Sequence, residues 1–521
     1  MTLRFTAHRQ LVPRETQALS GTTPSFIGRF AVKMAKFPSN TMKMMLNNFY
    51  FKVGVGETNT GNAVVIDNLY LERSSTSVQV LFSGLGSVTL ANGDSEILSD
   101  AISPTSFSLT EWPGDDGMWG RVEGHLAAPG NIPVGRSRTE ETGTQAFMYD
   151  AATTSLVNGA SGTGAFTTNN GGETNTSFGF SPLIVGTYSS ADPPCAIVAC
   201  DSHGEGVGSR TVPYSDGKPG FVCNALIDSD GASNAYALCQ VGSPGASVED
   251  FLTPNPVKWQ AFIAYANIFI SELGGNQSAT SAFSSLWTVA RNGGVSAIIQ
   301  THVLPQTTST DSWATEAGQT ADVSINPDIA ATNTFLIARF TDSTVEYYCP
   351  IKSARGLLDH DKWYVTGAAF GATLDGDHMA SAQNSLTGRA ATEFRASWAA
   401  IVNGTPVLKS QSVDTITTST AIASVTTNQA TGTLYVVVVP DGDQIPTAAE
   451  IKAGQRSGGN AALFASSKAI TAAGVQTFTI TGLSTATNYD VYFIHNNDVL
   501  LEADSLTAIL EADGVTPILT V

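Results

Sequence analysis

Short runs in which apolar and polar residues alternate fill residues 26–150. Asn48 to Val53, Ser77 to Phe82 and Ser87 to Leu90 are examples, separated by turn-forming Gly, Asn, Asp and Ser residues. A period of two places every second side chain on one face of a strand. The pattern predicts a jelly-roll-like, antiparallel β-sandwich as an accessory domain over residues 26–182, preceded by an N-terminal arm at residues 1–25.

The end of this accessory domain has a different composition. Residues 151–181 are rich in Gly, Asn, Ser and Thr without a clear period, which is typical of a surface loop or linker. Within the sandwich, Trp112, Trp119 and His125 could stack on a sugar. Buried aromatic residues in a β core are more common, so we favour a packing role for them.

From about residue 183 the pattern changes to apolar strands that alternate with helices. Strand, helix and strand in succession imply a parallel sheet with helices on both faces, which predicts a three-layer α/β domain over residues 183–402. Residues 303–345 form an unusually long connection in it. The predicted strands are Cys195–Cys200, Ala235–Val241, Phe262–Ile270 and Val295–Gln300, and the predicted helices are Ser281–Arg291 and Arg389–Val402.

The last part of the chain is rich in Thr, Val and Ala and predicts a second β-sandwich over residues 403–521. Thr433–Val439, Thr477–Thr481 and Tyr489–Ile494 have the composition of strands. The segment from Thr481 to Tyr489 resembles a late-strand signature of fibronectin type III domains. The resemblance implies that the tyrosine packs at a corner between strands, and it implies no chemistry.

Length, charge and composition limit the domain number, the partners and the cellular location that this chain can have. A chain of 521 residues suggests about three domains, and a net charge of -19 argues against a nucleic-acid partner. The sequence contains no run of 18 apolar residues, so it predicts no helix that spans a membrane. The first residues lack the apolar core of a secretory signal. The predicted architecture is typical of surface proteins, so we expect an extracellular, cell-surface or virion-associated protein. A cytoplasmic location stays open, and so does assembly into a homo-oligomer.

The five cysteines do not have the spacing of a metal site. Cys195 and Cys200 lie at the two ends of one predicted strand, about 16 Å apart, too far for a disulfide. For Cys223, Cys239 and Cys349 we favour buried thiols over pairing. We expect neither a metal nor a cofactor.

Candidate chemistry begins where the first of these strands ends. Asp201 and Ser202 follow the apolar run directly, before glycines at positions 204, 206 and 208. A serine in this position stands at the carboxyl edge of a sheet, where open α/β folds bind their ligands. The alternative is an ordinary polar turn.

The Asp-Gly-Asp-His segment at residues 375–378 offers a base and an orienting carboxylate. An imidazole activates a serine best when a carboxylate fixes its tautomer. Residues three apart share a helical face or meet across one turn, whereas neighbours point apart. We therefore take Asp375 as the partner of His378 and regard Asp377 as a decoy.

Four segments together resemble the SGNH (GDSL) hydrolase family. Its first block is matched by Asp201 and Ser202 with Gly206, its second by residues 242–247, its third by residues 274–277 and its fifth by residues 375–378. The blocks occur in the family's order within about 180 residues. The resemblance covers residues 183–402 and implies a flavodoxin-like α/β hydrolase domain.

The resemblance also implies the residue roles. Ser202 would be the nucleophile, His378 the base and Asp375 its orienter. The oxyanion hole would combine the N–H groups of Ser202 and Gly245 with the side-chain amide of Asn276. Two positions depart from the family, because Cys200 replaces a glycine and Gln277 replaces an aspartate. These departures bear on rate and substrate range more than on reaction type.

Other residues compete for roles in the site. His203, His302 and His360 are alternative bases, although His203 would normally point away from the site as the neighbour of the nucleophile. Trp313 lies in the long connection and could line the substrate cleft or simply pack.

We expect a serine esterase that removes acyl groups, with O-acetyl as the expected group, from a carbohydrate, because flanking sandwiches suit a polymeric or surface substrate. A lipase or thioesterase is the rival among enzymes and predicts an apolar cleft beside Ser202. A structural or adhesive phage virion protein on a hydrolase scaffold is the rival from another class. That interpretation predicts that Ser202, His378 and Asp375 do not converge.

Overall fold

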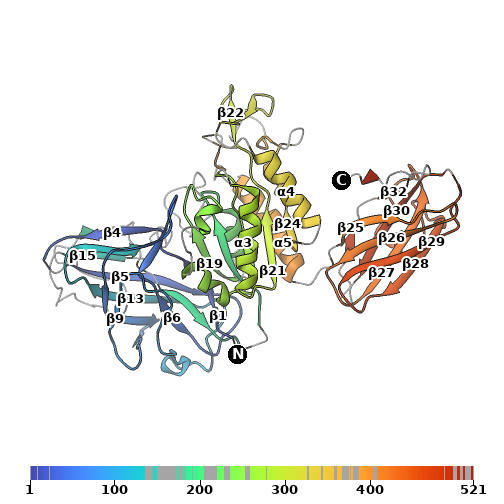
Figure 1. Cartoon of the computed structure of the whole chain (residues 1–521). Coiled ribbons are helices and arrows are strands. Elements are labelled where there is room, and N and C mark those ends of the chain that lie inside the picture. Colours follow the sequence, from blue (N-terminus) through green and yellow to red (C-terminus); the bar gives the residue numbers. More distant parts are fainter. Residues whose placement is uncertain are drawn as a thin grey trace. The chain divides into compact units, whose positions relative to one another are not determined.

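The chain is β-rich, with several sheets and few helices, and it forms two compact units (Figure 1). Unit 1 comprises Met1–Leu336 and Tyr347–Arg395, and unit 2 comprises Ile337–Glu346 and Ala396–Val521. The structure is a computed structural model. It describes residues 2–8, 10–22, 24–134, 145–149, 163, 173–174, 180, 182–189, 192–204, 220–227, 235–252, 258–276, 278–324, 328–341, 344–356, 361–365, 373, 375, 377–379, 386–402, 406, 408–485, 487–496, 502–504, 508–510 and 518–519.

Two sheets of unit 1 face one another around an apolar core. Their strand orders are β10-β9-β13-β5-β15-β16, with β2 and β11 at the side, and β1-β17-β6-β12. Phe30 of β5, Ile66 of β9 and Met44 of β6 meet in that core. The elements are β1 (Arg4–Phe5), β2 (Ala7–His8), β3 (Gln10–Leu11), β4 (Glu15–Leu19), β5 (Ser25–Met34), β6 (Lys43–Leu46), β7 (Phe49–Lys52), β8 (Gly56–Asn59), β9 (Val64–Arg73), β10 (Thr76–Gln79), β11 (Val88–Leu90), β12 (Ile97–Leu98), η1 (Pro104–Phe107), β13 (Gly117–His125), β14 (Gly130–Val134), β15 (Gln145–Tyr149), β16 (Glu173–Thr174) and β17 (Leu183–Gly186).

The three side chains considered for sugar stacking have protein partners. Trp112 is fully buried in the core of this sandwich. The guanidinium of Arg29 lies 3.8 Å from the ring centre of Trp119, and the imidazole of His125 is 2.8 Å from a carboxylate oxygen of Asp67. These contacts agree with the packing interpretation.

A parallel sheet of six strands forms the other part of unit 1, in the order β24-β21-β20-β18-β19-β3. Every residue of β18, β19, β20 and β21 is buried, as expected for strands covered on both faces. The elements are β18 (Cys195–Cys200), α1 (Phe221–Ile227), β19 (Ala237–Gly242), η3 (Glu249–Phe251), α2 (Lys258–Ala261), η4 (Phe262–Tyr265), β20 (Ile268–Ser271), α3 (Thr280–Asn292), β21 (Ala297–Thr301), β22 (Thr307–Ser309), β23 (Gln319–Ala321), α4 (Ile329–Thr341), β24 (Tyr347–Cys349), η5 (Lys352–Ala354) and α5 (Leu386–Val402).

The strand order of this sheet fixes where a ligand can bind. β18 comes first in the chain after the sandwich, and the next two strands, β19 and β20, lie on its two opposite sides. The order in which the chain adds strands to the sheet therefore reverses at β18, although all the strands are parallel. In open α/β sheets ligands bind at such a switch point, outside the carboxyl ends of the strands.

Several local predictions differ from the structure. Phe262–Tyr265 forms a 3-10 helix before β20, because its apolar side chains pack on neighbouring elements instead of joining the sheet. The long connection at residues 303–345 contains the helix α4. The predicted N-terminal arm supplies β3, which pairs with β19 as the sixth parallel strand.

Unit 2 contains two antiparallel sheets, β25-β26-β29 and β28-β27-β30-β32-β33, with β31 beside β30. The burial of β26 alternates at every residue, so one face packs inward. The hydroxyl of Tyr489 accepts a hydrogen bond from the backbone N–H of Ser484 at 2.9 Å. The elements are β25 (Leu408–Asp414), β26 (Thr420–Thr427), β27 (Thr433–Pro440), α6 (Ala448–Lys452), β28 (Phe464–Ala469), β29 (Gly474–Thr481), β30 (Tyr489–Asn496), β31 (Glu502–Asp504), β32 (Ala508–Leu510) and β33 (Ile518–Leu519).

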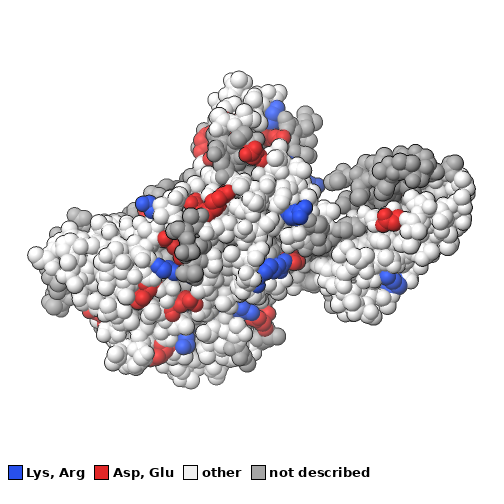
Figure 2. Space-filling model, viewed as in Figure 1, with Lys and Arg blue, Asp and Glu red and all other residues white. Residues whose placement is uncertain are grey.

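All five cysteines are buried and none of them forms a disulfide, which is the outcome favoured for Cys223, Cys239 and Cys349. None of the described helices has the length and apolarity needed to cross a membrane. Figure 2 shows that lysine and arginine side chains on one face of the described surface occur singly or in small groups among mostly uncharged residues. The loop predicted at residues 151–181 lies almost entirely outside the described residues.

Candidate active site

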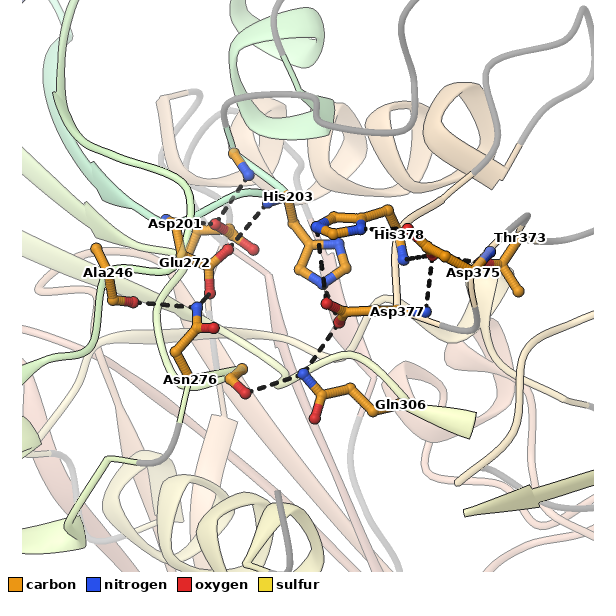
Figure 3. Close-up of polar contacts among 12 residues, drawn as sticks. Asp201, His203, Ala246, Glu272, Asn276, Gln306, Thr373, Asp375, Asp377 and His378 are labelled. Atoms are coloured by element: carbon orange, nitrogen blue, oxygen red, sulfur yellow. Dashed lines mark hydrogen bonds and ion pairs between the residues drawn. The ribbon is translucent and has the colours of Figure 1, made fainter. Parts of the chain in front are cut away.

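The candidate site is built from loops that follow consecutive strands of the parallel sheet (Figure 3). Asp201, Ser202 and His203 come directly after β18 and are 1%, 6% and 4% exposed. They therefore lie at the switch point, where open α/β sheets bind their ligands. The backbone N–H of His203 donates to the carboxylate of Asp201 at 2.9 Å, which closes the loop into a turn.

A buried glutamate at the end of β20 holds this turn in place. One carboxyl oxygen of Glu272 accepts hydrogen bonds from the backbone N–H groups of Asp201, at 3.3 Å, and Gly204, at 3.0 Å. A Cβ atom at Gly204 would lie 2.3 Å from the Cβ of Cys200 and 2.9 Å from the same carboxyl group. Only glycine therefore fits at position 204, and Glu272 is a site residue that the sequence analysis missed.

Glu272 and Asp201 are two buried carboxyl groups next to one another. Burial raises the pKa of Glu272 well above its ordinary value, and the charge of Asp201 raises it further. One proton held between two carboxyl groups avoids two adjacent buried negative charges. The pair therefore favours a proton on Glu272, with Asp201 as the carboxylate.

Asn276, the predicted oxyanion donor, lies after β20 beside the turn. Its side-chain amide donates to the carboxylate of Asp201 at 3.1 Å and to the backbone carbonyl of Ala246 at 3.2 Å. An asparagine has two N–H donors, and both are used here. To bind an oxyanion, Asn276 must exchange one of these bonds for a bond to the substrate.

Gly245 lies in the turn after β19 with φ at 84°, a conformation that favours glycine. It immediately precedes Ala246, the residue bonded to Asn276, so the second and third predicted blocks meet in space. This contact connects the loops after β18, β19 and β20 through Asp201, Asn276 and Ala246 (Figure 3).

His378 and Asp375 form the pair that the sequence predicted. The imidazole Nδ1 lies 2.7 Å from one carboxylate oxygen of Asp375, and the backbone N–H of His378 donates to the other at 2.8 Å. Burial pushes the pKa of Asp375 upward, but these two hydrogen bonds outweigh it and hold the pKa at about 2. Asp375 is therefore ionised across the neutral range, which leaves Nε2 of His378 as the basic nitrogen.

Asp377 was expected to point away, and here the structure differs. One of its carboxylate oxygens is 3.7 Å from Nε2 of His203, and the other is 3.7 Å from Nε2 of His378. The side-chain amide of Gln306, which follows β21, donates to Asp377 at 3.0 Å. In Figure 3 both imidazoles lie close to this carboxylate, His203 from the turn after β18 and His378 from the loop that also carries Asp377. The prediction assumed that adjacent side chains point apart, as they do in a helix. It was wrong because this segment is an irregular loop.

His203 also faces the site, against expectation. Its ring centre is 5.4 Å from that of His378 and 6.1 Å from that of the buried Trp363. Burial alone would lower the pKa of His203, but the hydrogen bond to Asp377 and the charge of Asp201 outweigh it and raise the pKa. Its Nδ1 is buried and has no hydrogen-bond partner among the described residues. His203 can therefore carry a proton next to the candidate base.

The structure does not join the predicted nucleophile to the predicted base. Within the described part of the chain no hydrogen bond links Ser202 to His378, whose Nε2 faces Asp377 instead. Ser202 is next to His203 in the sequence, and the His203 ring centre is 5.4 Å from that of His378, so the turn that carries Ser202 reaches the candidate base. Catalytic hydrogen bonds are often long in ligand-free enzymes and shorten with substrate.

His302 and Trp313 have partners outside this cluster. The imidazole of His302 is paired with the hydroxyl of Tyr348 on β24. Trp313 belongs to the β22–β23 hairpin, where its indole N–H donates to the hydroxyl of Thr307 at 2.9 Å. Gly206, Gln277 and His360 lie outside the described residues. The role of Trp313 in the substrate cleft stays a prediction.

Among the described residues, no group of three or more histidine, cysteine or acidic side chains is arranged to hold a metal ion. The two histidines and the carboxylates of the site instead pair with one another and with backbone groups.

Comparison with known proteins does not assign the chain to a family. No model of a known protein family matches the sequence, and no curated protein is significantly similar to it. The function must therefore be argued from the site itself.

Proposed function

We propose that the protein is a serine ester hydrolase whose central domain has the three-layer, flavodoxin-like layout of the SGNH hydrolases. The single observation that carries the proposal is the bonded Asp375–His378 pair placed beside the turn that contains Ser202. This turn follows the strand at the switch point of a parallel sheet. The flanking domains would be a jelly-roll-like sandwich and a fibronectin type III-like sandwich.

In the proposed reaction the Ser202 hydroxyl attacks the ester carbonyl carbon while Nε2 of His378 takes its proton. The carbonyl oxygen becomes an oxyanion, which would be held by the N–H groups of Ser202 and Gly245 and the amide of Asn276. The bond to the alcohol then breaks, and the alcohol oxygen receives the proton from His378. Water, deprotonated by the same imidazole, then attacks the acyl carbon. The bond to the Ser202 oxygen breaks, this oxygen takes the proton back from His378, and the acid leaves.

We infer a carbohydrate ester, with acetyl as the acyl group, as the substrate. This step rests on architecture, since sandwich domains beside a catalytic domain suit a polymeric substrate. Lipase or thioesterase activity is the alternative within the same chemistry, and a preference for long acyl chains would support it.

Assays on short-chain nitrophenyl esters and on acetylated polysaccharides test the proposal. We expect hydrolysis by the wild type and a loss of at least about 10⁴-fold in kcat for Ser202→Ala, because the other groups cannot replace the nucleophile. Equal turnover by the two proteins would remove Ser202 from the reaction.

A non-catalytic scaffold is the second candidate function. It is favoured by one observation, that both amide donors of Asn276 are already bonded to the protein. This candidate predicts no turnover of any ester by the wild type, together with retained binding to a polysaccharide or cell surface.

A further inference from the structure

The β7–β8 hairpin belongs to the first part of unit 1 but packs on loops of the parallel sheet. The ring of Phe49 stacks on Phe262 with ring centres 5.9 Å apart, and the ring of Phe51 lies 4.5 Å from that of Phe251. Two hydrogen bonds extend this contact, from the backbone N–H of Trp259 to Glu57 and from the ammonium of Lys258 to Asn59. The hairpin is thus fixed against the sheet that carries the candidate site.

The tip of this hairpin presents two apolar side chains to solvent. Val53 is 37% exposed and Val55 is 42% exposed. The turn closes through a hydrogen bond from the N–H of Val55 to the carbonyl of Lys52 at 3.2 Å. Turns in water usually carry polar residues, so two exposed valines at one tip are not explained by folding alone.

The side chain of Val53 lies next to the predicted oxyanion glycine, Gly245. A Cβ atom at Gly245 would be 3.6 Å from a methyl group of Val53, and among the described residues other than its chain neighbours it would meet atoms of that valine alone within 4 Å. In the described part of the chain, Val53 is therefore the side chain that borders the space over Gly245. Ala246, the neighbour of Gly245, is hydrogen-bonded to Asn276, and Asn276 is hydrogen-bonded to Asp201. Gly245 is thus connected to the turn after β18.

We propose that Val53 determines specificity by packing against the acyl group of the ester and selecting short acyl chains. The inference rests on the proposed function. On a carbohydrate ester the acyl group is the apolar part next to the reacting carbonyl, and a valine is its chemical match. Because Val53 is within van der Waals range of the Gly245 position, an acetyl group fits beside it more readily than a longer chain.

The test compares nitrophenyl acetate, butyrate and hexanoate as substrates of the wild type, Val53→Ala and Val53→Phe. We expect Val53→Ala to raise the butyrate-to-acetate ratio of kcat/KM by about tenfold, the lower end of what one methylene group typically contributes to specificity. Val53→Phe should lower the same ratio. Val475→Ala is the matched control, because Val475 is a 67% exposed valine on β29 of unit 2. Its ratio should equal that of the wild type.

The outcomes separate this inference from the proposed function. Wild-type hydrolysis with the same chain-length ratio in all variants overturns the role of Val53 and leaves the esterase intact. A Val53→Ala effect on the choice of alcohol in a series of acetate esters, with the acyl ratio unchanged, also overturns the acyl assignment. If the wild type hydrolyses no ester, the proposed function itself fails. Melting temperatures of the variants show whether each one is folded.

Discussion

Asp377 illustrates how single residues set the charge of the candidate site. Burial would raise the pKa of its carboxyl, but the hydrogen bond and charge of His203, the charge of His378 and the amide of Gln306 outweigh it and lower the pKa. The ionised carboxylate lies 3.7 Å from the imidazoles of His203 and His378. It therefore stabilises a positive charge on either ring, alongside Asp375 and Asp201, which also face them.

We predict that Asp377→Asn lowers the pKa of His203. The contact with Asp377 and its negative charge are among the interactions that raise this pKa, and the amide of the variant carries no charge. The measurement is the pH titration of the His203 ring by NMR spectroscopy in the wild type and the variant. An unchanged titration of His203 would show that Asp377 does not stabilise the charged ring.

At the scale of elements, the site depends on how the end of β20 supports the turn after β18. Glu272 accepts two backbone N–H groups of that turn, and Asn276 holds Asp201 from the same loop. Strands β18 and β20 are neighbours in the parallel sheet, so their carboxyl ends lie side by side. A protonated carboxyl at this point lets the turn be buried without a second negative charge.

This arrangement predicts a pH-dependent stability. The raised pKa means that folded protein keeps a proton on Glu272 at pH values where the unfolded chain has lost it. The folded state then binds more protons, so its stability is full below the ordinary carboxyl pKa and falls as pH rises toward the raised value. Glu272→Gln cannot titrate.

The melting temperature of Glu272→Gln should therefore fall less steeply than that of the wild type between pH 5 and 9. Asp414→Asn, an exposed carboxylate on β25, serves as the control and should follow the wild type. Parallel curves for Glu272→Gln and the wild type would mean that Glu272 is ionised in the folded protein.

For the molecule as a whole, the sequence predicted periodic elements well. The α3 helix, α5 and the strands β18, β19 and β21 have nearly the predicted bounds, because their apolar residues recur at clear helical or strand spacing. It also predicted the Asp375–His378 contact, since a spacing of three residues within one short loop leaves few other geometries.

Features that depend on long-range contacts could not be predicted in this way. β3 is two residues long, and it is a strand only because β19 offers a free edge. His203, Asp377 and Glu272 come from three separate loops, and no local spacing shows that they meet. The docking of the β7–β8 hairpin on the parallel sheet likewise depends on aromatic pairs about 200 residues apart.

Covalent labelling of the nucleophile tests the central claim most directly. The hydroxyl oxygen of an activated serine attacks the phosphorus of a nitrophenyl alkylphosphonate and displaces nitrophenol. The serine then carries a phosphonyl ester. We predict one adduct per chain by intact mass, located on the peptide containing Ser202, and reduced at least about 100-fold in labelling rate in His378→Ala. An unlabelled wild-type protein, or an adduct on another serine that is insensitive to His378→Ala, would contradict the account.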